Sequence, residues 1–113
     1  MEWKGQFCAS SQSGHRVATS PEEWASAWAA VGQAAPSAPD FSQQFAVFVF
    51  LGQRNTGGYG VKWLETTSSD TVLSIRYLET KPSGMTMQVM TQPFAVHLFP
   101  RTGRQIKVEK ASD

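Results

Sequence analysis

Residues 45–63, FAVFVFLGQRNTGGYGVKW, decide the fold of this chain. The run from Phe45 to Leu51 is entirely apolar, which is typical of a central strand that is covered on both faces. The alternating pattern from Tyr59 to Trp63 indicates a second strand, and the polar segment Gly52–Gly58 joins the two. We therefore predict a hairpin in which Gly57 or Gly58 has a positive φ that residues with a Cβ rarely adopt.

A single helix is predicted before this stretch. Ser20 is a suitable N-cap, Pro21 suits the first helical position, and Glu23 completes a capping box. Gly32 is a suitable stop. Between them, apolar residues recur with the spacing of one helical face, which consists of Trp24, Ala27, Trp28 and Val31. We predict that the two Trp side chains of this face pack on the sheet and serve stability instead of binding.

Most of the remaining chain is predicted to form strands joined by turns. Besides the hairpin, the candidate strands are residues 2–8, 16–19, 73–77, 85–90, 94–99 and 106–109. The predicted fold class is α+β and mainly antiparallel β. We expect a small sandwich or open barrel of about seven or eight strands with one packed α-helix. A single domain over residues 1–113 is expected.

Composition and charge argue against several classes of partner. The net charge of +1 and the charged share of 17% disfavour a broad nucleic-acid interface, which needs massed Lys and Arg. No apolar run approaches the length of a membrane span. The start, Met1-Glu2-Trp3-Lys4, lacks the pattern of a signal peptide. Cys8 is the only cysteine and cannot form an intrachain disulfide.

No motif in the sequence has the spacing of a catalytic, metal or phosphate site. The glycines at 57–58 lead into a strand pattern, whereas a phosphate loop leads into a helix. His15 and His97 have no second ligand at zinc-site spacing. No spacing points to a serine nucleophile with its base and acid. We therefore expect no cofactor, no metal and no enzymatic activity, with a small hydrolase as the least favoured alternative.

Arg54 is a candidate for binding a carboxylate of a partner, and a solvated side chain is an equal alternative. In a simple up-and-down meander, alternate connections share one end of the sheet. That topology would bring together the loops Gly52–Gly58, Lys81–Gly84 and Arg101–Gly103. They would form a basic tip suited to an acidic patch on a partner. A strand that crosses over would instead separate them.

Several short motifs occur in a fixed order along the chain. They are Ser20-Pro21-Glu22-Glu23-Trp24 with Trp28, Asp40-Phe41, Gly52-x-Arg54-x-Thr56-Gly57-Gly58-Tyr59, Glu79-x-x-Pro82-x-Gly84 and Thr91-x-Pro93-Phe94. With this set the chain resembles the PrcB C-terminal domain family from about Val17 to Phe99. The family commonly has Tyr where this chain has Phe94.

The family is named after a non-catalytic subunit of a bacterial surface protease complex. The resemblance implies a non-catalytic module that associates with or stabilises a protease or another protein. Together with the expected basic tip, it gives the candidate partner-binding residues Arg54, Asn55, Thr56, Gly57, Gly58, Tyr59, Lys81 and Arg101. Family members are often exported or surface-attached, whereas this sequence shows no signal, so we predict no compartment.

A second likeness concerns the hairpin loop alone. Chagasin-type inhibitors of cysteine peptidases use a Thr-Thr-Gly-Tyr/Phe loop on an immunoglobulin-like sandwich, and Thr56-Gly57-Gly58-Tyr59 with Trp63 is similar to it. The inhibitors' Gly-rich second loop and Arg-Pro-aromatic third loop have no counterpart in this sequence. The alternative function is therefore direct protease inhibition by the same loop.

Overall fold

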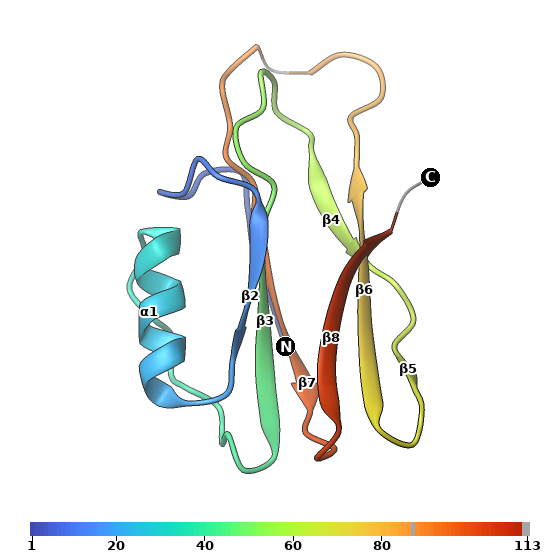
Figure 1. Ribbon diagram of the computed structural model, residues 1–113. Coiled ribbons are helices and arrows are strands. Elements are labelled where there is room, and N and C mark those ends of the chain that lie inside the picture. The colour runs from blue at the N-terminus through green and yellow to red at the C-terminus, as the bar shows by residue number, and fades with distance from the viewer. Residues whose placement is uncertain (87, 112–113) are drawn as a thin grey trace.

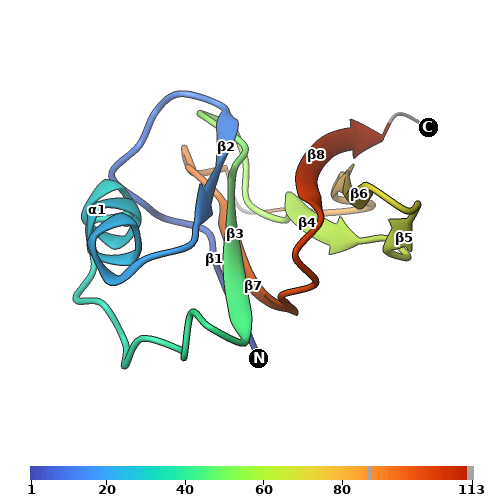
Figure 2. The same ribbon diagram turned by 60° about the horizontal axis from the view of Figure 1, so that its bottom comes forward.

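The computed structural model describes residues 1–86 and 88–111, which form a helix and two β-sheets in three layers (Figures 1 and 2). The elements are β1 (Glu2–Gly5), β2 (Gly14–Ala18), α1 (Pro21–Val31), β3 (Gln44–Phe50), β4 (Gly60–Trp63), β5 (Thr67–Ser68), β6 (Val72–Thr80), β7 (Phe94–Pro100) and β8 (Gln105–Ala111). This small sandwich confirms the predicted α+β, mainly antiparallel fold class. Within the described residues, no helix is long and apolar enough to cross a membrane.

The first sheet has the antiparallel strand order β1-β7-β3-β2, with β3 in a central position. Both faces of β3 are covered, because alternate residues face α1 on one side and the second sheet on the other. Phe48 and Phe50 pack towards the helix, whereas Val47 and Val49 pack towards the second sheet. The apolar run therefore forms the central strand that the sequence predicted.

Helix α1 begins and ends where its sequence signals predicted. The Glu23 amide donates to Ser20 Oγ at 3.2 Å, and Gly32 ends the helix in the left-handed region at φ 86°. The carboxylate of Glu23 accepts the amide of Thr19 at 2.9 Å, one residue before the N-cap. The side chains of Trp24 and Trp28 are each only 2% exposed and meet Phe48 edge to face, which confirms their predicted packing role.

The second sheet is centred on β6, which pairs with β4 and β5 on one side and with β8 on the other. The β6–β8 ladder is parallel, in contrast to every other ladder among the described residues. It is parallel because the chain leaves β6 for the first sheet, runs down β7, and only then returns as β8.

The predicted strand over residues 85–90 is wrong for the residues that the structure describes. Residues 85–86 and 88–90 have no strand structure, and Met87 lies outside the described residues. The segment from Lys81 to Met90 instead leads from the second sheet back to the first. Because the chain makes one reversal fewer than the predicted meander, β7 and β8 run opposite to the directions that the meander would give them.

Candidate partner-binding site

The β3–β4 loop and the segment between β6 and β7 meet at one end of the sandwich, the upper end in Figure 1. Arg54 and Thr91 form an isolated bridge there, in which each backbone amide donates to the other's carbonyl at 2.8 Å. The loops Gly52–Gly58 and Lys81–Gly84 therefore share an end, as the sequence predicted.

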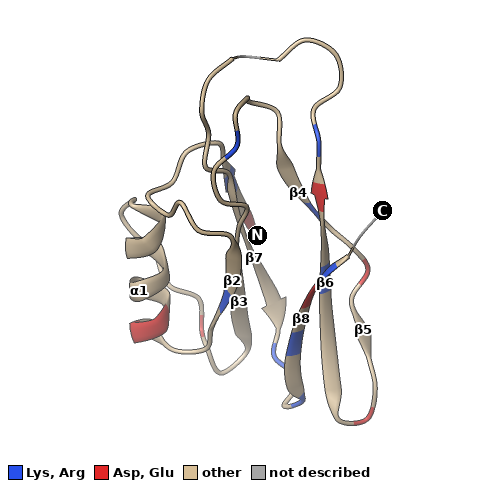
Figure 3. Ribbon diagram, turned by 45° about the horizontal axis from the view of Figure 1, so that its top comes forward, with Lys and Arg blue, Asp and Glu red and all other residues tan. Residues whose placement is uncertain are grey.

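The third loop of the expected basic tip lies at the opposite end. Pro100 is paired with Gln44 at the start of β3, and the Arg101 amide donates to the Gln43 carbonyl at 2.8 Å. The predicted basic tip is therefore wrong. Without the strand predicted at residues 85–90, β7 runs in the opposite direction and places Arg101 at the other end. Figure 3 accordingly shows Lys and Arg at both ends of the molecule. Arg101 lies apart from Arg54 and Lys81 and cannot share a surface with them.

Arg54 binds a carboxylate of its own chain. Its Nη2 and Nε atoms donate to the two carboxylate oxygens of Glu79, at 2.7 and 3.1 Å. Two parallel bonds of this kind fix both the position and the orientation of the guanidinium. The side chains are 26% and 11% exposed, so the pair is largely shielded from water. Neither alternative considered for Arg54, a partner's carboxylate or free solvation, describes this arrangement.

Glu79 occupies this position because it continues the inward face of β6. Leu73, Ile75 and Tyr77 point into the core between the sheets, and the same alternation turns Glu79 inward at the open end. The hydrogen bonds from Arg54 lower the pKa of Glu79, and Lys110 Nζ, 3.0 Å from Oε1, acts in the same direction. Glu79 is thereby held as a carboxylate, and it ties the hairpin loop to β6 and β8.

The ring of Tyr59 provides a second contact for Arg54. The guanidinium carbon lies 5.5 Å from the ring centroid, within the range of a cation–π interaction. The hydrogen bonds with Glu79 also raise the pKa of Arg54, which therefore keeps its charge. Arg54 and Tyr59 thus stabilise the hairpin from inside, and most of the Arg54 side chain is not available to a partner.

Gln6 fixes the second half of the hairpin. Its Oε1 accepts the Gly58 amide at 3.1 Å, and its Nε2 donates to the Tyr59 carbonyl at 2.7 Å. The side-chain amide thus pairs with the backbone as a neighbouring strand would. No motif in the sequence points to this role of Gln6. Its partners are backbone groups, which leave no residue pattern in the sequence.

Gly58 is the hairpin glycine with a positive φ, at 94°. A Cβ at this position would lie 2.7 Å from the Cβ of Pro82, so the backbone conformation and the close approach both require glycine. The prediction that Gly57 or Gly58 has a positive φ is confirmed for Gly58. Thr91, which is 1% exposed, donates its hydroxyl to the Thr56 carbonyl at 2.9 Å on the other side of the loop.

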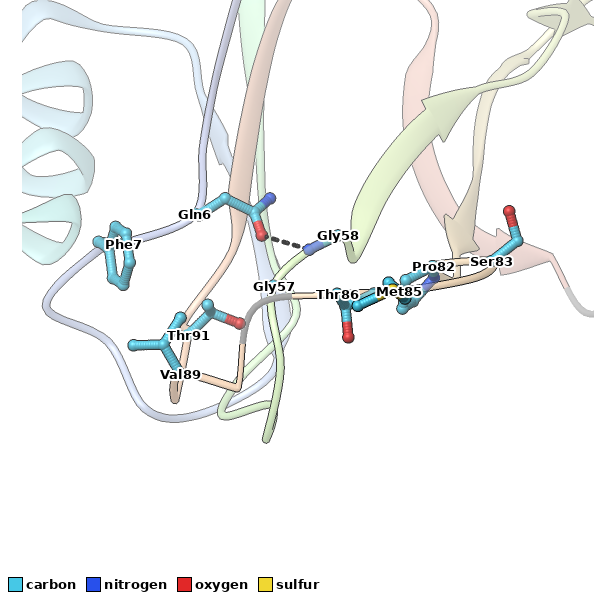
Figure 4. A pocket seen from close by; sticks show the side chains of 10 residues that line it. All are labelled: Gln6, Phe7, Gly57, Gly58, Pro82, Ser83, Met85, Thr86, Val89 and Thr91. Carbon is cyan, nitrogen blue, oxygen red and sulfur yellow. Dashed lines mark hydrogen bonds between the residues drawn. The ribbon is translucent and has the colours of Figure 1, made fainter.

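An open groove of about 430 Å³ lies beside this hairpin (Figure 4). Its walls come from the segment after β1, from the hairpin and from the segment after β6, and none of the described residues that line it is charged. The lining residues are Gln6, Phe7, Gly57, Gly58, Pro82, Ser83, Met85, Thr86, Val89 and Thr91. Phe7 is 58% exposed and Met85 is fully exposed, so two large apolar side chains of the lining face water.

A model of the PrcB C-terminal family matches residues 45–97, from the start of the apolar strand to β7. This match confirms the resemblance to the PrcB C-terminal family over residues 45–97. No curated protein and no solved structure matches the chain. The matched stretch begins after α1, so the helix motif that contributed to the resemblance lies outside it. The extension of the domain to residues 1–113 stays a prediction.

The geometry gives the PrcB C-terminal motifs a common physical role. Three residues of the hairpin motif contact residues of later motifs: Arg54 binds Glu79, Gly58 packs on Pro82, and Thr56 accepts from Thr91. These motifs are well separated in the sequence because they come together only in the folded chain. They build and stiffen the wall of the groove.

The remaining candidate residues differ in their surroundings. Asn55 is exposed at the loop, and Lys81 is exposed beside Pro82 of the groove. His97 packs against Trp63 and Phe99 between the sheets, as expected for a strand side chain. Among the described residues, no group of three or more His, Cys, Asp or Glu side chains could hold a metal ion.

Proposed function

We propose that this chain is a non-catalytic protein-binding module whose docking surface is the groove beside the PrcB C-terminal hairpin. One observation carries the proposal. The large apolar side chains that are exposed in the described part of the chain are Met1, Phe7, Met85 and Met90, and three of these lie at the groove or next to it. Apolar side chains gathered on one surface are typical of an interaction site.

The occupant that fits this surface is an extended segment of a partner protein with an apolar anchor residue. The described lining residues are uncharged, so an apolar side chain that enters the groove removes water from no charged group among them. Lys81, the exposed cation beside Pro82, favours an acidic residue next to the anchor. The family name supports a partner in a protease complex, and we therefore propose a protease or a protein of such a complex.

The predicted site residues then have distinct roles in this proposal. Gly57 and Gly58 form the wall, Asn55 and Lys81 contact the partner, and Arg54 holds the wall in place. Thr56 and Tyr59 support the same wall through their backbone and ring contacts. Arg101 takes no part, because it lies at the other end of the sandwich.

Selection from a library of displayed linear peptides tests the groove directly. We expect enrichment of sequences with an apolar anchor beside Asp or Glu, and loss of their binding in Phe7→Ser and Met85→Ser. Lys62→Ser is the matched control, because Lys62 is exposed on β4 away from the groove. Peptides that bind the groove variants as tightly as the wild type would contradict the proposed surface.

Direct protease inhibition is the second candidate function. The observation that favours it is the set of side-chain contacts on the hairpin, which Gln6 and the Arg54–Glu79 pair supply. A rigid loop loses little conformational entropy on binding, which suits an inhibitor. Turnover assays with a panel of cysteine and serine peptidases separate the two functions. An inhibitor slows turnover in proportion to its occupancy, whereas a docking module leaves turnover unchanged.

A further inference from the structure

Strand β8 forms a long free edge of the second sheet. It has seven residues in an unbroken ladder, and β6 is its only strand neighbour in the described part of the chain. The other edge strands are shorter, with four residues in β1, five in β2, four in β4 and two in β5. Short edge strands protect a sheet against further pairing, and β8 lacks this protection.

The direction of the backbone groups along β8 follows from one hydrogen bond. The Gln105 amide donates to the Thr71 carbonyl at 2.9 Å, so the backbone groups of Gln105 point towards β6. In a parallel ladder, alternate residues of a strand bond to the same neighbour. The amides and carbonyls of Ile106, Val108 and Lys110 therefore point to the open side of β8.

We propose that a second copy of this chain pairs antiparallel with this edge, centred on Val108. In that register Val108 faces Val108 of the second copy, and Ile106 faces Lys110. These are the residues whose backbone groups point outwards, so about six backbone hydrogen bonds form across the two-fold axis. The two second sheets then join into one continuous sheet.

The charges of β8 complement themselves in this register. Lys107 faces Glu109 of the second copy at both non-hydrogen-bonded positions, where side chains approach most closely. Within one copy the two side chains already form an ion pair of 2.7 Å, and they are 60% and 43% exposed. Pairing therefore keeps both charges balanced. Ile106 and Val108 point inwards and are only partly buried, so the second copy also covers apolar surface.

Charge variants test both the pairing and its register. In sedimentation experiments between about 10 µM and about 1 mM, we expect the wild type to form a concentration-dependent dimer. In the Lys107→Glu variant, the new carboxylate of each copy faces Glu109 of the other copy, which creates two repulsive pairs. We expect the dimer Kd to rise by roughly tenfold or more. The double variant Lys107→Glu/Glu109→Lys restores opposite charges and should restore the dimer. Lys62→Glu, on the other side of β6, is the control and should leave the Kd unchanged.

Amide hydrogen exchange gives an independent readout of the same interface. In the dimer, the amides of Ile106, Val108 and Lys110 become protected as the concentration rises, whereas those of Lys107 and Glu109 are protected at every concentration by β6. A wild type that stays monomeric at about 1 mM overturns the proposal. A dimer that Lys107→Glu leaves intact, or one without the alternating protection, overturns it as well.

Discussion

The guanidinium of Arg54 and the carboxylate of Glu79 form a two-bond ion pair at the open end of the sandwich, although 25 residues separate them in the chain. Glu79 stands at a position where the alternation of β6 directs side chains into the core. Its carboxylate is therefore largely shielded from water and needs a counterion to remain ionised. Arg54 supplies that partner and at the same time fixes the hairpin that walls the groove.

Removing Arg54 should therefore destabilise the protein more than its place on a loop suggests. We expect Arg54→Ala to lower the free energy of unfolding by about 1–3 kcal/mol, because Glu79 loses two charge-assisted hydrogen bonds in a shielded site. Arg54→Lys should recover only part of this, since an ammonium cannot make the two parallel bonds. Urea denaturation at neutral pH measures both values.

Lys110→Ala is the control for this prediction, because Lys110 also contacts Glu79 but is 49% exposed. We expect it to cost about 0–1 kcal/mol, the range for a surface ion pair. Equal losses for Arg54→Ala and Lys110→Ala would show that the shielded geometry of the Arg54 pair contributes nothing.

The same ion pair should make stability depend on acid pH. The folded-state pKa of Glu79 is lowered from its ordinary value of 4.5 by the hydrogen bonds of Arg54, so its contribution is present above that value and is lost as the pH falls through the folded-state pKa. We expect the wild type to be more stable than Glu79→Gln at pH 7, and the gap to narrow below pH 4.5. Urea midpoints of both proteins across this range measure the gap, and a constant difference would contradict the prediction.

Gly58 should tolerate no side chain. Gly58→Val combines an unfavourable positive φ with the approach to Pro82, and we expect it to cost about 1–3 kcal/mol in unfolding free energy. Gly84 provides the matched control, because it has a φ of 77° but open space where a Cβ would stand. Gly84→Val reports the backbone strain alone. Denaturation midpoints of the two variants separate strain from steric contact, and a Gly58→Val midpoint equal to wild type would refute this reading of the turn.

Replacing each of the two tryptophans of α1 by Phe should lower the free energy of unfolding by different amounts. Trp28→Ala should cost about 3–5 kcal/mol, as expected for a large side chain lost from the core. Trp24 Nε1 donates to the Pro36 carbonyl at 3.0 Å, whereas the buried Trp28 Nε1 has no partner among the described residues. Trp24→Phe should therefore cost about 1 kcal/mol more than Trp28→Phe, because only the first loses a hydrogen bond. Thermal or urea denaturation of the two Phe variants measures this order.

Local signals in the sequence predicted the parts of the fold that depend on neighbouring residues. The capping pattern at Ser20–Glu23 and the apolar run Phe45–Leu51 gave the helix and the central strand, because periodicity and capping are properties of short segments. Gly58 was predictable for the same reason. Among the later strands, the two-residue β5 was not predicted, and the strand predicted at residues 85–90 is wrong because a local pattern cannot show that a strand has a neighbour to pair with.

The candidate site was less predictable because it depends on topology. The position of Arg101 relative to Arg54 depends on how many times the chain reverses direction between them. The sequence-based prediction contained one strand too many and therefore placed Arg101 at the wrong end of the sheet. From the sequence, Arg54 could bind a partner's carboxylate or be solvated, whereas the fold supplies Glu79 as its counterion. Gln6 could not be found, since a side chain that bonds to distant backbone groups has no local pattern.

The contacts of Gln6 also set the order in which the molecule can be completed during synthesis. Gln6 and its hydrogen-bonded partner Gly58 are 52 positions apart, and among the described residues β7 is the one strand that pairs with β1. A nascent chain that has released the helix and the hairpin still lacks β7, so β1 has no strand to join and Gln6 is not yet held beside the loop. The end that carries the groove therefore closes only after β7 has also left the ribosome, and a chain that stops before β7 cannot present it.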